Sequence, residues 1–130
     1  HGINGPGGWW ILPEPELHFG PDVLVPDFAG WRRARMPKLP DAAYFTLAPD
    51  WVCEVLSPST TRLDRTKKLA IYARAGVPHA WLVDPLAQTL EVLRLEQGRW
   101  TILATHAGDE VVCAEPFAEV DLPLASLWAE

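Results

Sequence analysis

Short apolar runs separated by Pro and Gly dominate this chain, a pattern that predicts strands joined by tight turns. The predicted strands cover residues 9–12, 16–19, 23–28, 51–56 and 80–83. In the third of these, Pro26 indicates a sheet edge or a bulge. Between residues 29 and 50 three prolines interrupt the pattern, so this segment is expected to be a loop with one short helix.

A helical pattern follows the strand 51–56. Residues 61–75 are predicted to form the helix, with its apolar side formed by Leu63, Ala70, Ile71 and Ala73. Gly76-Val77-Pro78 ends it, since a glycine followed by a proline is typical of a helix C-terminus. We therefore expect strands 51–56 and 80–83 to be parallel neighbours joined by a right-handed crossover.

The remainder of the chain consists of strand-like runs separated by turns, a pattern typical of an antiparallel meander. Strands are predicted over residues 89–95, 100–105 and 110–113, and the tail from Pro116 is expected to add a short strand and a helical turn. The fold class is therefore α/β or α+β, with one mixed sheet, a crossover helix and a C-terminal antiparallel meander. A length of 130 residues suits one domain, so residues 1–130 are predicted to form a single domain.

Composition narrows the class of protein. With 48% apolar and 22% charged residues the chain is typical of a globular protein. No run reaches the roughly 18 apolar residues of a membrane-spanning helix, and no signal peptide is evident, so we expect a cytoplasmic protein that does not bind membranes. Cys53 and Cys113 lie in separate strand-like runs and are predicted to be buried free thiols, not a disulfide or a zinc site.

Two carboxylates occupy positions where a carboxylate is costly. Glu54 interrupts the apolar run 51–56, and Asp27 ends the run that begins at Val23. If these strands are neighbours, the two side chains converge, and with the backbone carbonyl of Val55 they would offer hard oxygen ligands suited to Mg²⁺ or Mn²⁺. The alternatives are a turn role for Asp27 and a salt bridge from Glu54 to Arg62, Arg65 or Lys68.

Lys68 is the third candidate, because its helix begins directly after the Glu54 strand. A lysine beside two metal-binding carboxylates would position or activate a water, or stabilise a pentavalent phosphate. The alternative is a solvated helix face on which Asp64 and Lys68 form an ordinary i, i+4 salt bridge.

Seven tryptophans are a further unusual feature. Most are flanked by apolar residues at strand positions, which favours packing in the core. Trp31, next to Arg32 and Arg33, is expected to be the most exposed of them. A carbohydrate-binding β module is an alternative that requires exposed, coplanar tryptophan rings.

Several motifs in this order resemble a known family. They are Val25-Pro26-Asp27, the run from Cys53 to Thr60, Asp64-Arg65 with Lys68 and Tyr72, Ala75-Gly76-Val77-Pro78, and Trp81-Leu82-Val83-Asp84-Pro85. Together they resemble the restriction-endonuclease-like family of largely uncharacterised bacterial proteins, within the PD-(D/E)XK nuclease superfamily. The resemblance covers about residues 16–115 and is most specific from Glu54 through Pro85.

The resemblance implies a restriction-endonuclease-like core and Mg²⁺-dependent endonucleolytic hydrolysis of DNA phosphodiester bonds. Asp27 and Glu54 match the two acidic residues of the motif. The superfamily lysine two residues beyond the second acid is Leu56 here, and Lys68 matches the lysine that this family carries on the following helix. The resemblance also implies that the family's N-terminal helix is missing from this chain, and that a homodimer would suit cleavage of both strands. The alternative function is a non-catalytic binding or oligomerisation domain that has kept the nuclease fold.

Charge is distributed unevenly along the chain. The net charge is −6, yet residues 32–74 carry nine basic and four acidic side chains. This excess lies around the proposed site, where a phosphate backbone would bind. The residues expected to contact nucleic acid are Arg32, Arg33, Arg62, Arg65 and Lys67. The alternative is a chance clustering of charge on solvated loops and one helix face.

Overall fold

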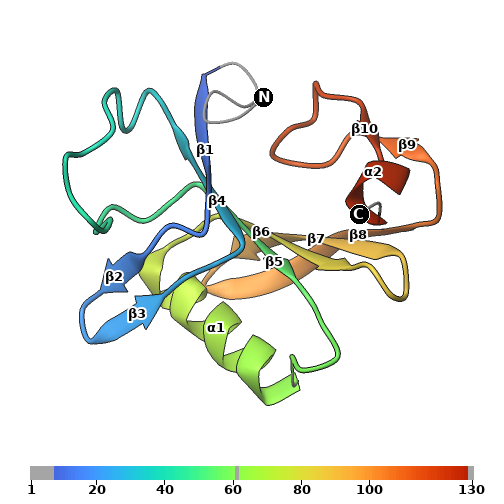
Figure 1. Cartoon of the computed structure of the whole chain (residues 1–130), viewed down its shortest axis with the longest axis horizontal. Coiled ribbons are helices and arrows are strands. Elements are labelled where there is room, and N and C mark those ends of the chain that lie inside the picture. The colour runs from blue at the N-terminus through green and yellow to red at the C-terminus, as the bar shows by residue number, and fades with distance from the viewer. Residues whose placement is uncertain (1–7, 61, 129–130) are drawn as a thin grey trace.

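The computed structural model describes residues 8–60 and 62–128, and its central element is a six-stranded mixed sheet (Figure 1). In spatial order its strands are β1 (Trp9–Pro13), β4 (Phe28–Arg32), β5 (Trp51–Val55), β6 (His79–Asp84), β7 (Thr89–Glu96) and β8 (Arg99–Ala107). Only β5 and β6 are parallel, and α1 (Arg62–Ala75) connects them. The predicted mixed sheet and its crossover helix are thus confirmed.

Two small antiparallel pairs complete the fold. β2 (Leu17–Phe19) pairs with β3 (Asp22–Leu24), and β9 (Val111–Val112) pairs with β10 (Leu122–Pro123). A single helical turn, α2 (Ala125–Trp128), follows β10. Figure 1 shows α1 on one side of the sheet and β9, β10 and α2 on the other.

The central sheet separates two apolar clusters because successive side chains of a strand point to opposite faces. On β5, Trp51 and Cys53 pack with Trp81, Phe117 and other residues beneath the C-terminal segment. Val52, between them, packs on the opposite face with Tyr72 of α1. Glu54 follows Cys53 by one position, so it shares the α1 face of the sheet with Val52.

The region around Asp27 differs from the prediction. The single strand expected over residues 23–28 is two strands, because β3 ends at Leu24 and β4 begins at Phe28. Pro26 lies between them, and proline cannot donate a ladder hydrogen bond. β4 also runs into the segment 29–50, which was expected to be a loop, and the predicted short helix is absent from this segment.

Trp31 was expected to be the most exposed tryptophan, and this prediction is wrong. It is fully buried in β4, stacks on Phe45 at 4.6 Å and donates its indole N–H to the carbonyl oxygen of Leu47 at 2.9 Å. No tryptophan of the chain is exposed; four are buried and three are half-buried. The carbohydrate-binding alternative, which requires exposed coplanar rings, is therefore wrong.

The C-terminal third follows the prediction in part. β7 and β8 form the expected antiparallel pair, and the tail supplies the expected short strand and helical turn. The third meander strand does not join the sheet, because β9 pairs with β10 instead. Cys53 is buried as predicted, and burial raises the pKa of its thiol, whereas Cys113 is exposed and therefore contradicts the prediction.

The orientation of α1 differs from the expected one. Of the predicted apolar side, Leu63 is 61% exposed and Ala70 is exposed, whereas Ile71 and Ala73 are half-buried. The one buried side chain of the helix is Tyr72, and it shares the i, i+3, i+4, i+7 spacing of one face with the half-buried Arg65, Lys68 and Leu69. A largely polar face thus packs over the end of the sheet that carries Glu54. None of the helices in the part of the chain that the structure describes is long and apolar enough to cross a membrane.

Candidate active site

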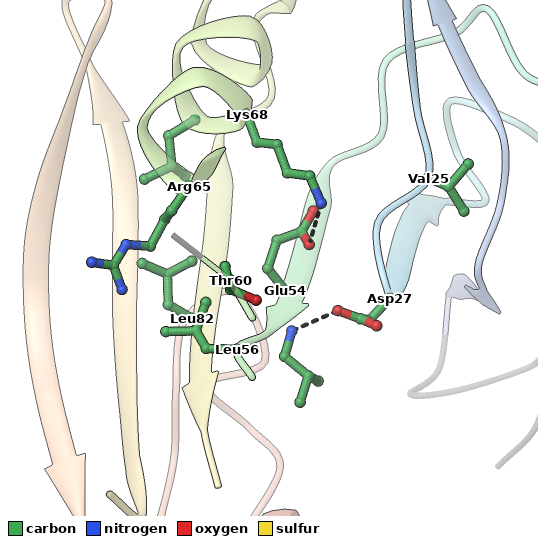
Figure 2. A pocket seen from close by; sticks show the side chains of 10 residues that line it. Val25, Asp27, Glu54, Leu56, Thr60, Arg65, Lys68 and Leu82 are labelled. Atoms are coloured by element: carbon green, nitrogen blue, oxygen red, sulfur yellow. Dashed lines mark hydrogen bonds and ion pairs between the residues drawn. The ribbon is translucent and has the colours of Figure 1, made fainter. Parts of the chain in front are cut away.

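A pocket of about 220 Å³ opens where the C-terminal end of β5 meets α1 (Figure 2). The side chains and backbone that line it come from the link before β4, from β5 and the loop after it, and from α1 and β6. They are Val25, Asp27, Glu54, Val55, Leu56, Thr60, Arg65, Lys68, Leu69 and Leu82. The structure therefore brings Asp27, Glu54 and Lys68 to one place, from segments up to 41 positions apart in the sequence.

Glu54 is the buried acid of the pocket, with only 7% of its surface exposed. Its Oε2 accepts a hydrogen bond from the Tyr72 hydroxyl at 2.6 Å, and its Oε1 lies 3.4 Å from Lys68 Nζ. Burial raises the pKa of Glu54, while the Tyr72 hydrogen bond and the Lys68 charge partly offset the rise. Burial without an added cation therefore disfavours the carboxylate form of this side chain.

Asp27 reaches the pocket from the link between β3 and β4. Its neighbour Phe28 pairs with Cys53, and this register places Asp27 beside Glu54 and Val55. Asp27 Oδ2 accepts a hydrogen bond from the backbone N–H of Val55 at 2.7 Å, drawn in Figure 2. Asp27 thus has a structural role that joins two segments of the sheet, which differs from the turn role given as the alternative, and it also borders the pocket. Its negative charge contributes to the raised pKa of Glu54.

Lys68 projects from α1 toward the two carboxylates (Figure 2). The side chain remains 39% exposed, so its ammonium group is reachable from solvent. Lys68 Nζ also forms a salt bridge with Glu54 Oε1, which was one of the alternatives for Glu54. At 3.4 Å this is a long contact. Leu56, at the superfamily's lysine position, lines the same pocket.

Tyr72 is the residue of this site to which the sequence analysis gave no role. It is fully buried, and its only described side-chain hydrogen bond is the one to Glu54. Burial and the charge of Glu54 raise the pKa of the Tyr72 phenol, so the hydroxyl stays protonated and acts as a donor. The helical spacing would have indicated it, because Tyr72 lies four positions after Lys68 and seven after Arg65.

The basic residues fall into two groups. Arg65 lines the pocket, but Figure 2 shows its side chain pointing away from Asp27 and Glu54. Arg62 and Lys67 are exposed on α1. Arg32 and Arg33 lie at the opposite end of β4 from Asp27, where their guanidinium groups stack on tryptophan rings at 4.6 and 3.9 Å. The positive charge is therefore spread over two regions and is not confined to the pocket.

Hydroxyl groups of the loop before α1 form a hydrogen-bonded turn. Thr60 Oγ1 accepts from the backbone N–H of Ser57 at 3.1 Å, and the Ser57 hydroxyl lies 2.9 Å from that of Ser59. These contacts are typical of a turn that precedes a helix.

The donor set of the pocket fits a hard cation. Two carboxylates face it, and the backbone carbonyl of Val55 is expected to point to the same side as its N–H, which Asp27 binds. Mg²⁺ prefers such oxygen ligands and keeps several waters, so two carboxylates suffice. Among the residues that the structure describes, no group of three His, Cys, Asp or Glu side chains is arranged to hold a metal ion.

Comparison with known proteins agrees with this fold. Residues 5–125 match the model of the Uma2 family, described as "Putative restriction endonuclease". A crystal structure from Anabaena variabilis, described as "a putative nuclease belonging to DUF820", shares 29% identity with this chain at a TM-score of 0.75. The match covers 97% of this chain and 73% of that one. No curated protein matches the sequence.

Proposed function

Because the chain belongs to the Uma2 family of restriction-endonuclease-like proteins, we propose that it is a Mg²⁺- or Mn²⁺-dependent endonuclease that hydrolyses DNA phosphodiester bonds. The observation that carries the proposal is the meeting of Asp27, Glu54 and Lys68 at one pocket. Two carboxylates and one cation suit phosphate chemistry, in which negative charge must be neutralised and a water positioned.

In this proposal Asp27, Glu54 and the Val55 carbonyl hold the metal ion. Burial raises the pKa of Glu54, and a divalent cation beside it would restore the carboxylate form. Such an ion, when bound, supplies a Lewis acid for the phosphate and lowers the pKa of a coordinated water. The chain itself contributes the orientation of both carboxylates, which the Val55 and Tyr72 hydrogen bonds fix.

Lys68 is proposed as the catalytic cation. Its side chain is partly exposed and lines the pocket, and its Nζ lies 3.4 Å from Glu54 Oε1. From there it would donate a hydrogen bond to the attacking water or to a phosphate oxygen, and so stabilise the charge that develops in the transition state. The side chain is long and half-exposed, so it can leave Glu54 for the substrate at little cost.

DNA is proposed to lie along α1. Arg65 at the pocket and the exposed Arg62 and Lys67 would contact its phosphates. Arg32 and Arg33 would contact the backbone only outside the pocket, because they lie at the far end of β4. A homodimer that cleaves both strands remains part of the proposal.

One observation favours the alternative of a non-catalytic, nuclease-fold binding domain. Leu56 occupies the superfamily's lysine position, so activity depends on Lys68 reaching the same place from a different element. Metal titration separates the alternatives, since a domain without a metal site would not bind Mg²⁺ or Mn²⁺ at millimolar concentration.

The direct test is cleavage of supercoiled plasmid and of circular single-stranded DNA with Mg²⁺ or Mn²⁺. We expect Glu54→Gln and Lys68→Met to lose cleavage by at least about 100-fold. The matched controls are Glu110→Gln, an exposed carboxylate of the C-terminal segment, and Lys38→Met, an exposed lysine between β4 and β5. Equal activity in Glu54→Gln and Glu110→Gln would refute the assignment.

A further inference from the structure

The carboxylate of Glu54 has two partners on α1 that differ in rigidity. Tyr72 is fully buried and donates to Oε2 at 2.6 Å, whereas Lys68 is 39% exposed and lies 3.4 Å from Oε1. The Tyr72 contact is the shorter of the two, and a fully buried ring has less freedom to move than a half-exposed lysine side chain. The phenol therefore determines the rotation of this carboxylate more than the ammonium group does.

Tyr72 is also held in place by its own helix end. The backbone N–H of Val77 donates to the Tyr72 carbonyl at 3.0 Å, the N–H of Gly76 donates to that of Ala73 at 3.0 Å, and Gly76 has a φ of 82°. This pattern is a Schellman motif, which ends a helix with defined geometry. The ring packs with Val52, Val77 and Leu82 in the cluster under α1.

The geometry points to Tyr72 as a positioning residue: we propose that its hydroxyl fixes the Glu54 carboxylate so that Oε1 faces the pocket, and thereby raises the affinity for a divalent cation. The terminal torsion of a glutamate is broad, so without a fixed donor the carboxylate would sample many orientations. Residues that orient a metal ligand typically change metal affinity by about 10- to 100-fold when mutated. This inference rests on the proposed metal site.

Tyr72→Phe is the informative variant because it removes one hydroxyl and keeps the ring. The only other tyrosine, Tyr44, is 42% exposed and stacks on His18, so Tyr44→Phe is a matched control. We would measure Mn²⁺ affinity by titration calorimetry at a temperature where circular dichroism shows every variant to be folded. We expect the dissociation constant to rise about 10- to 100-fold in Tyr72→Phe and to stay unchanged in Tyr44→Phe.

A donor-restoring variant separates positioning from packing. Tyr72→p-aminophenylalanine retains the ring and offers an N–H donor, so it is expected to recover most of the lost affinity. Wild-type Mn²⁺ affinity in Tyr72→Phe, or no recovery in the amino variant, would overturn the inference and leave the metal site standing. Failure of the wild-type chain to bind Mn²⁺ at millimolar concentration would overturn the proposed metal site and this inference with it.

Discussion

Asp27 combines a structural and a proposed metal-binding role, and two substitutions separate them. Its Oδ2 accepts the Val55 N–H at 2.7 Å, which ties the link before β4 to the end of β5. Asp27→Ala removes this bond and leaves the N–H without its partner. Asp27→Asn keeps an acceptor oxygen of the same shape and removes only the charge.

The size of the effect follows from the contact. A hydrogen bond to a charged group contributes about 1.5–3 kcal/mol, and the half-exposed setting of Asp27 favours the lower end. The entropy of unfolding is about 2.1 cal/mol/K per residue, which amounts to about 0.27 kcal/mol/K for the 130-residue chain. Asp27→Ala is therefore expected to lower Tm by about 5 °C, and Asp27→Asn by about 2 °C or less.

Thermal unfolding followed by circular dichroism, together with plasmid cleavage in Mn²⁺, tests both roles. We expect both variants to lose cleavage, while only Asp27→Ala loses substantial stability. An unchanged Tm in Asp27→Ala would show that the Val55 bond contributes nothing to stability. Wild-type cleavage by Asp27→Asn would refute Asp27 as a metal ligand.

Three further predictions concern stability and binding. Since burial raises the pKa of Glu54, the folded chain binds the carboxyl proton more tightly than the unfolded chain does, and stability falls as pH rises from the ordinary carboxyl pKa through the raised one. Glu54→Gln should therefore be more stable than the wild-type chain at pH 8 and lose this advantage in acid. Urea unfolding of both proteins at both pH values checks this. Gly30→Ala would place a Cβ 2.8 Å from Ile11 Cδ1 and 3.1 and 3.2 Å from two tryptophan rings. It should therefore lower the free energy of unfolding, measured in urea, by about 1–3 kcal/mol, and an unchanged free energy would contradict this packing. Arg65→Gln should weaken DNA binding about equally across sequences and reduce the slope of log affinity against log salt by about 1, and an unchanged slope would remove Arg65 from the interface.

The part of the fold that could be predicted is the part with strong local signals. The strand–helix–strand unit β5–α1–β6 lies within one residue of its predicted bounds, because an apolar run, a turn-forming loop and Gly76 each mark a boundary. β4 was missed because Gly30 is a poor strand former. Its place in the sheet depends on close approach of Ile11 and two tryptophan rings, which is a tertiary effect that local sequence does not contain.

The two carboxylates of the site could be predicted, but the face of α1 that meets them could not. Glu54 and Asp27 are conspicuous because they interrupt apolar runs. On α1 the apolar residues indicate the wrong side: the exposed Leu63 belongs to it, and the buried Tyr72 does not. Local pattern and tertiary structure disagree here because the buried Glu54 requires donors, and such conflicts are expected at functional sites.

The position of the lysine on α1, and not two residues after Glu54, can be tested directly. Leu56 lines the pocket from the loop directly after β5, and Lys68 lines it from α1 (Figure 2). If the pocket requires an ammonium group and not a particular element to carry it, Leu56→Lys should restore part of the cleavage lost in Lys68→Met.

The control for this rescue is Leu56→Met in the same Lys68→Met background, which supplies an unbranched side chain without charge. We expect at least about a 10-fold gain in cleavage from the lysine and none from the methionine, measured on plasmid DNA in Mn²⁺. No gain in a double variant that is folded and binds Mn²⁺ would mean that α1 contributes more than a charge. The placement of the ammonium group 3.4 Å from Glu54 Oε1 would then be one that only a side chain on α1 provides.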